Sequence, residues 1–367
     1  MSRRQDILAA AHAEMPARVP WTIYPGMLPR GEAERLLRNE GLCFAYSVPP
    51  TSPQIYEWGP NVEVRERRVV ERGQTLRRIT YHTPVGDLTE VRQTQYAAGM
   101  AGMVVDWKAE FMVKRPADYE VLEYMLRDQV IRTDDAAIAQ LQREVGDDGV
   151  VICKLAKVPF QLLWIEYTGM ERLVLDLADD PSPVERVMQA MLERDRKLWA
   201  LMAHSPVDLV HCSDNISGDM VSPRYWDKYF APYYQALTEA IPPAQKPLLV
   251  HIDGLLRSLA KRIQALPAGV IVEAMNPPPT GDLSVAEARA IWGDRPIWIN
   301  FPSTAHLFAP DEIEALTREI LRQAAPGNGF IVGVTENIPG ECWVDSMAAI
   351  GRAMNAYGKC PIAAVNG

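Results

Sequence analysis

Eight short apolar runs, separated by segments with helical spacing, constrain the fold of this chain most strongly. They lie at residues 19–24, 42–47, 150–155, 208–213, 247–252, 268–273, 296–301 and 329–334. Short apolar runs bounded by glycine and proline are typical of strands buried in a parallel sheet. Strands that alternate with helices over short links predict an α/β fold, here a (βα)8 TIM barrel.

Helix-start signals follow several of these runs. Ser222-Pro223 is typical of an N-cap and a first-turn proline, before a helix over 224–240. Ser182-Pro183 predicts another helix start, and Pro310 a third. These signals place helices between the predicted strands, as a barrel requires.

Residues 57–115 interrupt this rhythm. Segments 62–66, 75–81 and 88–91 alternate with a period of about two, and turn-forming residues separate them. We therefore expect a small antiparallel β meander, inserted after the second barrel strand of a single domain that spans residues 1–367. The meander could wall a substrate pocket, or it could be a lid or a dimer contact.

Composition excludes several classes of protein. The net charge of -9 argues against nucleic acid as a partner, since phosphate binding favours a basic surface. No apolar run reaches the roughly 18 residues that a membrane span needs. The N-terminal residues do not resemble a secretory signal, and the five cysteines form no CxxC pair. We expect a cytoplasmic protein, and the sequence leaves a homodimer open.

Acidic residues and one histidine stand where three of the apolar runs end. His251 and Asp253 follow 248–250, Glu273 follows 270–272, and Glu336 follows 330–334. The C-terminal ends of barrel strands share one mouth, where active sites lie. One imidazole and three carboxylates gathered there would be unfavourable without a cation or shared protons. The pattern predicts a divalent metal bound by His251, Asp253, Glu273 and Glu336.

Each predicted ligand has a structural alternative. His251 could be a packed histidine, and Glu336 could interact with a helix N-terminus. Asp253 could cap a turn before Gly254, or accept a hydrogen bond from a ligand imidazole. Glu273 ends a very apolar strand, where an unpaired carboxylate is costly.

Further polar residues follow the run at 208–213. Asp214 could be a general acid or base and Asn215 could bind substrate, the alternative being a hydrogen bond at the barrel rim. Asp253 is a second catalytic candidate. His211 and Cys212 lie within the strand, and packing explains them best.

Aromatic residues after Pro159 form another candidate site. Trp164 and Tyr167 could line a pocket that binds the substrate. Core packing is the stronger account of Trp164.

Several short motifs, in this order and spacing, resemble the uroporphyrinogen decarboxylase-like superfamily. They are Ser213-Asp214-Asn215, Ser222-Pro223-Arg224-Tyr225-Trp226, Pro232-Tyr233-Tyr234, His251-Ile252-Asp253-Gly254 and Gly329-Phe330-Ile331-Val332 followed by Glu336-Asn337-Ile338-Pro339. The superfamily includes the methylcobalamin:coenzyme M methyltransferases and other corrinoid-linked methyltransferases. The resemblance implies the same barrel fold.

The chain departs from true uroporphyrinogen decarboxylases near its N-terminus. Those enzymes carry an arginine-rich Met-Arg-Gln-Ala-Gly-Arg segment, which would grip the carboxylates of the substrate. The corresponding residues 20–27 contain no arginine. A porphyrinogen would lack its guanidinium clamp, so this decarboxylation is not expected.

The methyltransferase branch resembles the chain better. Its members hold zinc through a His-x-Cys pair, a glutamate and a later cysteine. His251 and Glu273 match the histidine and the glutamate, while Asp253 and Glu336 stand where the cysteines would be. Oxygen in place of sulfur makes a harder site, which favours an oxygen-bearing substrate. Zinc fits best, and manganese, iron or magnesium become admissible.

The resemblance implies a metal-dependent methyltransferase that acts on a small molecule. The chain lacks the cobalamin-binding Asp-x-His-x-x-Gly motif, so a corrinoid would come in trans on a partner protein. One alternative is a metal-dependent lyase or decarboxylase on the same barrel, without a corrinoid. Another is a binding protein without catalysis.

Overall fold

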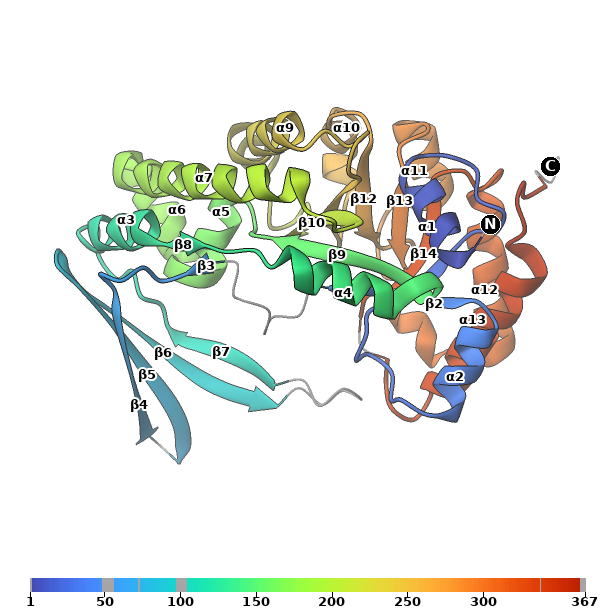
Figure 1. Ribbon diagram of the computed structural model, residues 1–367, viewed down its shortest axis with the longest axis horizontal. Coiled ribbons are helices and arrows are strands. Elements are labelled where there is room, and N and C mark those ends of the chain that lie inside the picture. Colours follow the sequence, from blue (N-terminus) through green and yellow to red (C-terminus); the bar gives the residue numbers. More distant parts are fainter. Residues whose placement is uncertain (1, 48–55, 72, 97–103, 337, 364–367) are drawn as a thin grey trace.

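Eight parallel strands close into a barrel in the computed structural model (Figure 1). The structure describes residues 2–47, 56–71, 73–96, 104–336 and 338–363. The barrel order is β1-β14-β13-β12-β11-β10-β9-β2, closed by pairing of β1 with β2. The strands are β1 (Trp21–Ile23), β2 (Leu42–Ser47), β9 (Gly149–Leu155), β10 (Leu209–Ile216), β11 (Leu248–Ile252), β12 (Val270–Met275), β13 (Ile297–Asn300) and β14 (Phe330–Val334). Each of the eight predicted runs overlaps one of these strands, and the (βα)8 prediction is confirmed.

Helices surround the barrel and close its base. The α-helices are α1 (Arg3–Ala11), α2 (Glu32–Asn39), α3 (Asp118–Asp128), α4 (Asp135–Val145), α5 (Pro159–Leu162), α6 (Met170–Asp179), α7 (Pro181–His204), α8 (Pro223–Tyr225), α9 (Ala231–Ala240), α10 (Ala260–Gln264), α11 (Val285–Trp292), α12 (Pro310–Gln323) and α13 (Trp343–Tyr357). Two π-helical turns, η2 (Leu163–Thr168) and η3 (Trp226–Phe230), and three 3-10 turns, η1 (Gly146–Asp148), η4 (Arg257–Leu259) and η5 (Ser303–Leu307), complete them. Within the described residues, no helix combines the length and the apolar character that a membrane crossing requires.

Two predicted helix starts show how local capping operates. Pro310 is the first residue of α12, as predicted. The long helix α7 begins at Pro181, two residues before the predicted first-turn proline, because the Asp180 carboxylate caps it by accepting from Ser182 N. The predicted N-cap at Ser182 is therefore wrong. Asp180 is the better cap because an ionised oxygen accepts more strongly than a hydroxyl.

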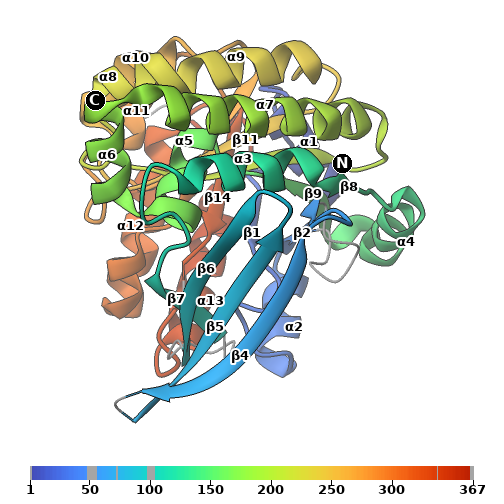
Figure 2. The same ribbon diagram turned by 90° about the vertical axis from the view of Figure 1, so that its left-hand side faces the viewer.

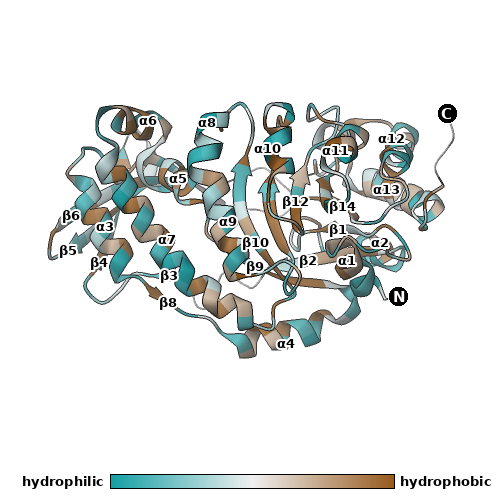
Figure 3. Ribbon diagram, turned by 90° about the horizontal axis from the view of Figure 1, so that it is seen from above, coloured by the Kyte–Doolittle hydropathy of each residue, from teal (hydrophilic) through white to brown (hydrophobic). Residues whose placement is uncertain are grey.

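The barrel interior is apolar at its base. A separate buried cluster joins inward-facing strand residues to α1, and its members are Ile7, Ala10, Ala11, Cys43, Ala45, Val150, Ile152, Leu209, Leu249, Ile271, Trp298 and Ile331. The larger core lies between the barrel strands and the surrounding helices. In Figure 3 the strands are brown over most of their length and turn teal at the arrowheads near β10. The open end of the barrel is therefore the polar end.

An antiparallel sheet lies beside the barrel, between β2 and β9 in the chain (Figures 1 and 2). Its strands run in the order β4 (Glu63–Glu71), β5 (Gln74–Thr83), β6 (Gly86–Tyr96) and β7 (Val104–Glu110). The first three overlap the predicted alternating segments, and β7 is an addition. A two-stranded ladder, β3 (Tyr56–Glu57) with β8 (Val130–Ile131), connects the insertion to the body. The predicted antiparallel insertion is confirmed.

A buried carboxylate ties this sheet to the barrel. Glu90 on β6 is fully buried and accepts from Tyr81 Oη at 3.0 Å and Lys108 Nζ at 2.6 Å. Lys108 also donates to the backbone oxygen of Glu166 in η2, at 2.6 Å. Since η2 follows β9, the sheet is anchored near the C-terminal ends of the barrel strands.

Gly333 on β14 allows the large ring of Trp298 to lie inside the barrel. A Cβ at Gly333 would lie 2.6 Å from Trp298 Nε1 and 2.8 Å from the Ile299 backbone oxygen. Gly333→Ala should therefore lower the free energy of unfolding by about 1–3 kcal/mol through overpacking, measured by chemical denaturation. Gly31→Ala is the control, since nothing lies within 4 Å of a Cβ there. Equal stabilities of the two variants would contradict this account.

Candidate active site at the barrel mouth

The inward face of four neighbouring strands changes from apolar to polar at one level. Side chains two positions apart on a strand face the same side, so the residue two positions after each base-layer residue points into the mouth. The pairs are Ile152 and Lys154 on β9, Leu209 and His211 on β10, Leu249 and His251 on β11, and Ile271 and Glu273 on β12. In the parallel register Lys154 is the partner of His211, and His251 is the partner of Glu273. The four polar residues thus form one layer above the apolar base.

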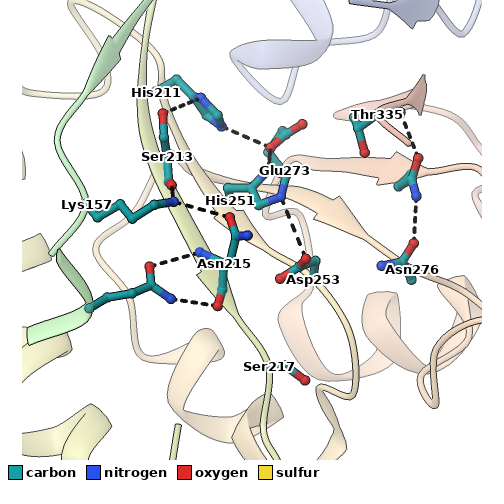
Figure 4. A network of polar contacts seen from close by, with 12 residues as sticks. Lys157, His211, Ser213, Asn215, Ser217, His251, Asp253, Glu273, Asn276 and Thr335 are labelled. Carbon is teal, nitrogen blue, oxygen red and sulfur yellow. Dashed lines mark hydrogen bonds and ion pairs between the residues drawn. The ribbon is translucent and has the colours of Figure 1, made fainter. Parts of the chain in front are cut away.

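Glu273 is the centre of this layer. Its Oε2 lies 2.5 Å from His251 Nδ1 and 3.0 Å from His211 Nε2 (Figure 4). Its Oε1 accepts from Tyr24 Oη at 3.0 Å. Ser213 Oγ lies 3.2 Å from the other nitrogen of His211. The carboxylate is only 1% exposed, so these partners replace the water that it has lost.

The contacts between Glu273 and the two imidazoles determine which of these three groups is charged. Burial alone would raise the pKa of Glu273, but the charge of His251 and hydrogen bonds from both imidazoles hold it well below its usual range. Burial opposes protonation of His251, yet the Glu273 carboxylate raises the pKa of that imidazole. Burial prevails at His211 and lowers its pKa. The carboxylate is therefore ionised and accepts from both rings.

Irregular backbone positions two of these side chains. The pairing of β12 with β13 shifts register between Glu273 and Met275, and Ala274 between them has a φ of 63°. The pairing of β10 with β11 shifts between Cys212 and Ile216. Bulges and left-handed non-glycine residues cost energy and are common next to functional sites, where they redirect a side chain.

His211, His251 and Glu273 could hold a metal ion. One ligand atom from each residue lies within 4.8 Å of the others. Two imidazole nitrogens and one carboxylate oxygen suit zinc and other divalent transition metals. Among the residues that the structure describes, this is the one such group of three. It contains the predicted His251 and Glu273.

Packing was the role expected for His211, whereas the structure places it in the barrel interior against Glu273. The period of two was the available signal, because His211 follows the inward-facing Leu209 as His251 follows Leu249. Polar residues were sought at the ends of apolar runs, and His211 lies inside its run, so its place in the site was not predicted.

The other two predicted ligands lie outside the group of three. Asp253 Oδ2 is 3.9 Å from His251 Nε2, on the side of the ring away from Glu273. Burial and the neighbouring Asp253 charge raise the pKa of Glu336, and burial raises that of Asp253. The charge of His251 lowers both pKa values. All three residues therefore interact electrostatically at the mouth.

Asp214, a predicted catalytic residue, points away from the mouth. It is fully buried, and it accepts from Val158 N at 2.8 Å and Tyr234 Oη at 2.7 Å. Cys212 Sγ lies 3.2 Å from its second oxygen. These contacts hold β10 against α5 and α9, so we leave Asp214 out of the proposed site.

Asn215, Trp164 and Tyr167 were predicted to bind substrate. Asn215 exchanges backbone hydrogen bonds with the Gln161 side chain, and its Oδ1 accepts from Lys157 Nζ at 3.3 Å. Trp164 and Tyr167 lie on η2 within the main core, and Trp164 packs edge-on against Phe160. A substrate role for these residues stays a prediction.

Tyr234→Phe tests the structural account of Asp214. The variant would remove a hydrogen bond to a buried carboxyl group, so the free energy of unfolding should fall by about 1.5–3 kcal/mol in chemical denaturation. Tyr357→Phe is the control, because that ring is 42% exposed. If the two variants are equally stable, the Asp214 contact does not stabilise the barrel.

The chain matches one protein-family model and several solved structures. Residues 110–357 match the family model described as uroporphyrinogen decarboxylase (URO-D). No curated protein gave a match. Among 29 matching solved chains is a "methyltransferase from Methanosarcina mazei", with a TM-score of 0.57 and 12% identity, covering 97% of this chain and 99% of that one. At this identity the likeness concerns the fold.

Proposed function

Because this chain belongs to the uroporphyrinogen decarboxylase (URO-D) family, we propose that it is a metal-dependent methyltransferase. It moves a methyl group between an oxygen-bearing small molecule and a corrinoid protein. The observation that carries the proposal is the pair of imidazoles on one buried carboxylate at the barrel mouth. The shared fold with a methanogen methyltransferase supports it.

His211, His251 and Glu273 would hold the metal, and Asp253 and Glu336 would lie at the mouth beside it. The donor set fits, since the group of three offers nitrogen and oxygen but no thiolate. Zinc, or another divalent metal, would supply Lewis-acid polarisation of a substrate oxygen when bound. Such a hard set favours an ether or hydroxyl oxygen over a thiol.

A carboxyl group on the solvent side of the site would donate the proton that the demethylated product needs. Transfer of a methyl group from an ether leaves an alkoxide or phenoxide, which needs one proton to become a stable alcohol or phenol. Burial raises the pKa of Asp253, and a carboxyl group with a raised pKa can donate this proton. Glu273 cannot, because it stays ionised between the two imidazoles.

Metal binding is the first test. The purified protein should contain about one divalent ion per chain by elemental analysis, and His251→Ala and His211→Ala should each lose most of it, since catalytic sites commonly have three protein ligands. His12→Ala is the matched control, because His12 is exposed on the far side of the barrel base. A wild-type protein that neither retains nor takes up a metal would overturn the proposal.

Methyl transfer is the second test. With a reduced corrinoid protein and a panel of methoxylated compounds, the metal-loaded enzyme should methylate the cobalt, followed by the absorbance of the corrinoid. Glu273→Gln should slow this reaction by about 10–100-fold or more. Release of carbon dioxide or an aldehyde with no corrinoid present would instead identify the lyase or decarboxylase.

A further inference from the structure

One charged side chain in the polar layer has no part in the metal site. Lys154 follows the inward-facing Ile152 on β9, and its backbone pairs with that of His211. Adjacent strands lie roughly 4.8 Å apart, so Lys154 is next to the proposed ligands. Its side chain is exposed to the mouth.

The Lys154 ammonium lacks an acidic partner. Its Nζ lies 5.0 Å from the centre of the Tyr24 ring, whose hydroxyl is occupied by Glu273. No ion pair among the described residues includes Lys154, although those of His211 and His251 with Glu273 lie next to it. A cation held over an aromatic face leaves its N–H groups for another acceptor.

A second ammonium lies on the same wall. Lys157, just beyond β9, donates to the backbone oxygen of Ser213 and, at 3.3 Å, to Asn215 Oδ1 (Figure 4). Its positive charge acts on both His251 and Asp253. Two of its three N–H groups are thus used by neutral oxygens, and the third is left for a ligand.

We propose that Lys154 and Lys157 bind a carboxylate of the substrate, which makes the methyl donor a methoxylated carboxylic acid. This inference rests on the proposed function and names its substrate class. The β9 wall carries two ammonium groups, whereas the β11 and β12 walls carry the metal ligands. A donor with a carboxylate at one end and a methoxy group at the other would therefore be held in one direction, with its ether oxygen toward His251 and Asp253.

Charge balance agrees with this assignment. With Asp253 protonated as the proton donor, the carboxylates of Glu273 and Glu336 face a divalent metal and two ammonium groups, so the mouth carries an excess of positive charge. An anionic substrate would reduce this excess, while a neutral substrate would leave both ammonium groups without a counterion.

Binding of matched probes tests the proposal. Methoxyacetate and the three methoxybenzoates would each be compared with the primary amide of the same skeleton, by calorimetry on metal-loaded and metal-free protein. We expect at least one carboxylate to bind about tenfold more tightly than its amide, as a charge-assisted hydrogen bond allows. Lys154→Met should reduce this preference to about twofold or less, and Lys154→Arg, which keeps the charge, should retain most of it.

Lys197→Met is the control, because Lys197 is exposed on α7, and it should leave both the preference and the metal content unchanged. If no carboxylate binds better than its amide, or if Lys154→Met keeps the preference, the proposal is wrong. A protein that takes up no metal and still prefers carboxylates would refute only the metal site. A metal-loaded protein without the preference would refute only the anion site.

Discussion

The mouth of the barrel depends on one buried negative charge. A carboxylate as enclosed as Glu273 would be strongly destabilising alone, because no water solvates it. It is tolerated because two imidazoles and a tyrosine hydroxyl, from three other strand ends, converge on its two oxygens. The contact therefore fixes Tyr24, His211 and His251 relative to one another. The geometry of the candidate site follows from satisfying this single group.

The barrel interior has an apolar base that stabilises the fold and a polar mouth that contains the candidate site. Below the polar layer, apolar side chains and α1 fill the base, and Trp298 Nε1 donates a hydrogen bond to Thr22 Oγ1 at 3.0 Å. Above it, charged and polar groups face the opening. Because the ligands lie on strands, the packed base holds them more firmly than loops could, and residues in the surrounding loops can vary without moving them.

Much of the fold could be predicted from the sequence because strands and helices alternate and glycine, proline and N-cap residues mark where they begin and end. The eight apolar runs and the alternating pattern of the insertion identified the barrel and most of the extra sheet. The site was harder to predict. Polar residues at strand ends identified His251 and Glu273, but His211 required the inward face to be followed back along β10. Asp214 shows the converse, since a position after an apolar run does not determine which side of the strand a residue faces. A β-bulge changes the side of the sheet to which the following residues point. The sequence around Ala274 does not predict the register shift found there.

The helix α1 gives the barrel a closed base. Ile7, Ala10 and Ala11 seal the end of the interior opposite the polar layer, so small molecules have one way in and the same way out. A protein as large as a corrinoid carrier that settles on the rim would cover this opening. If the proposed corrinoid carrier docks there, the methyl donor must enter before the carrier docks, and the demethylated product can leave only after the carrier has departed. Kinetics with the two substrates varied independently would show this order as inhibition of the donor reaction by excess carrier.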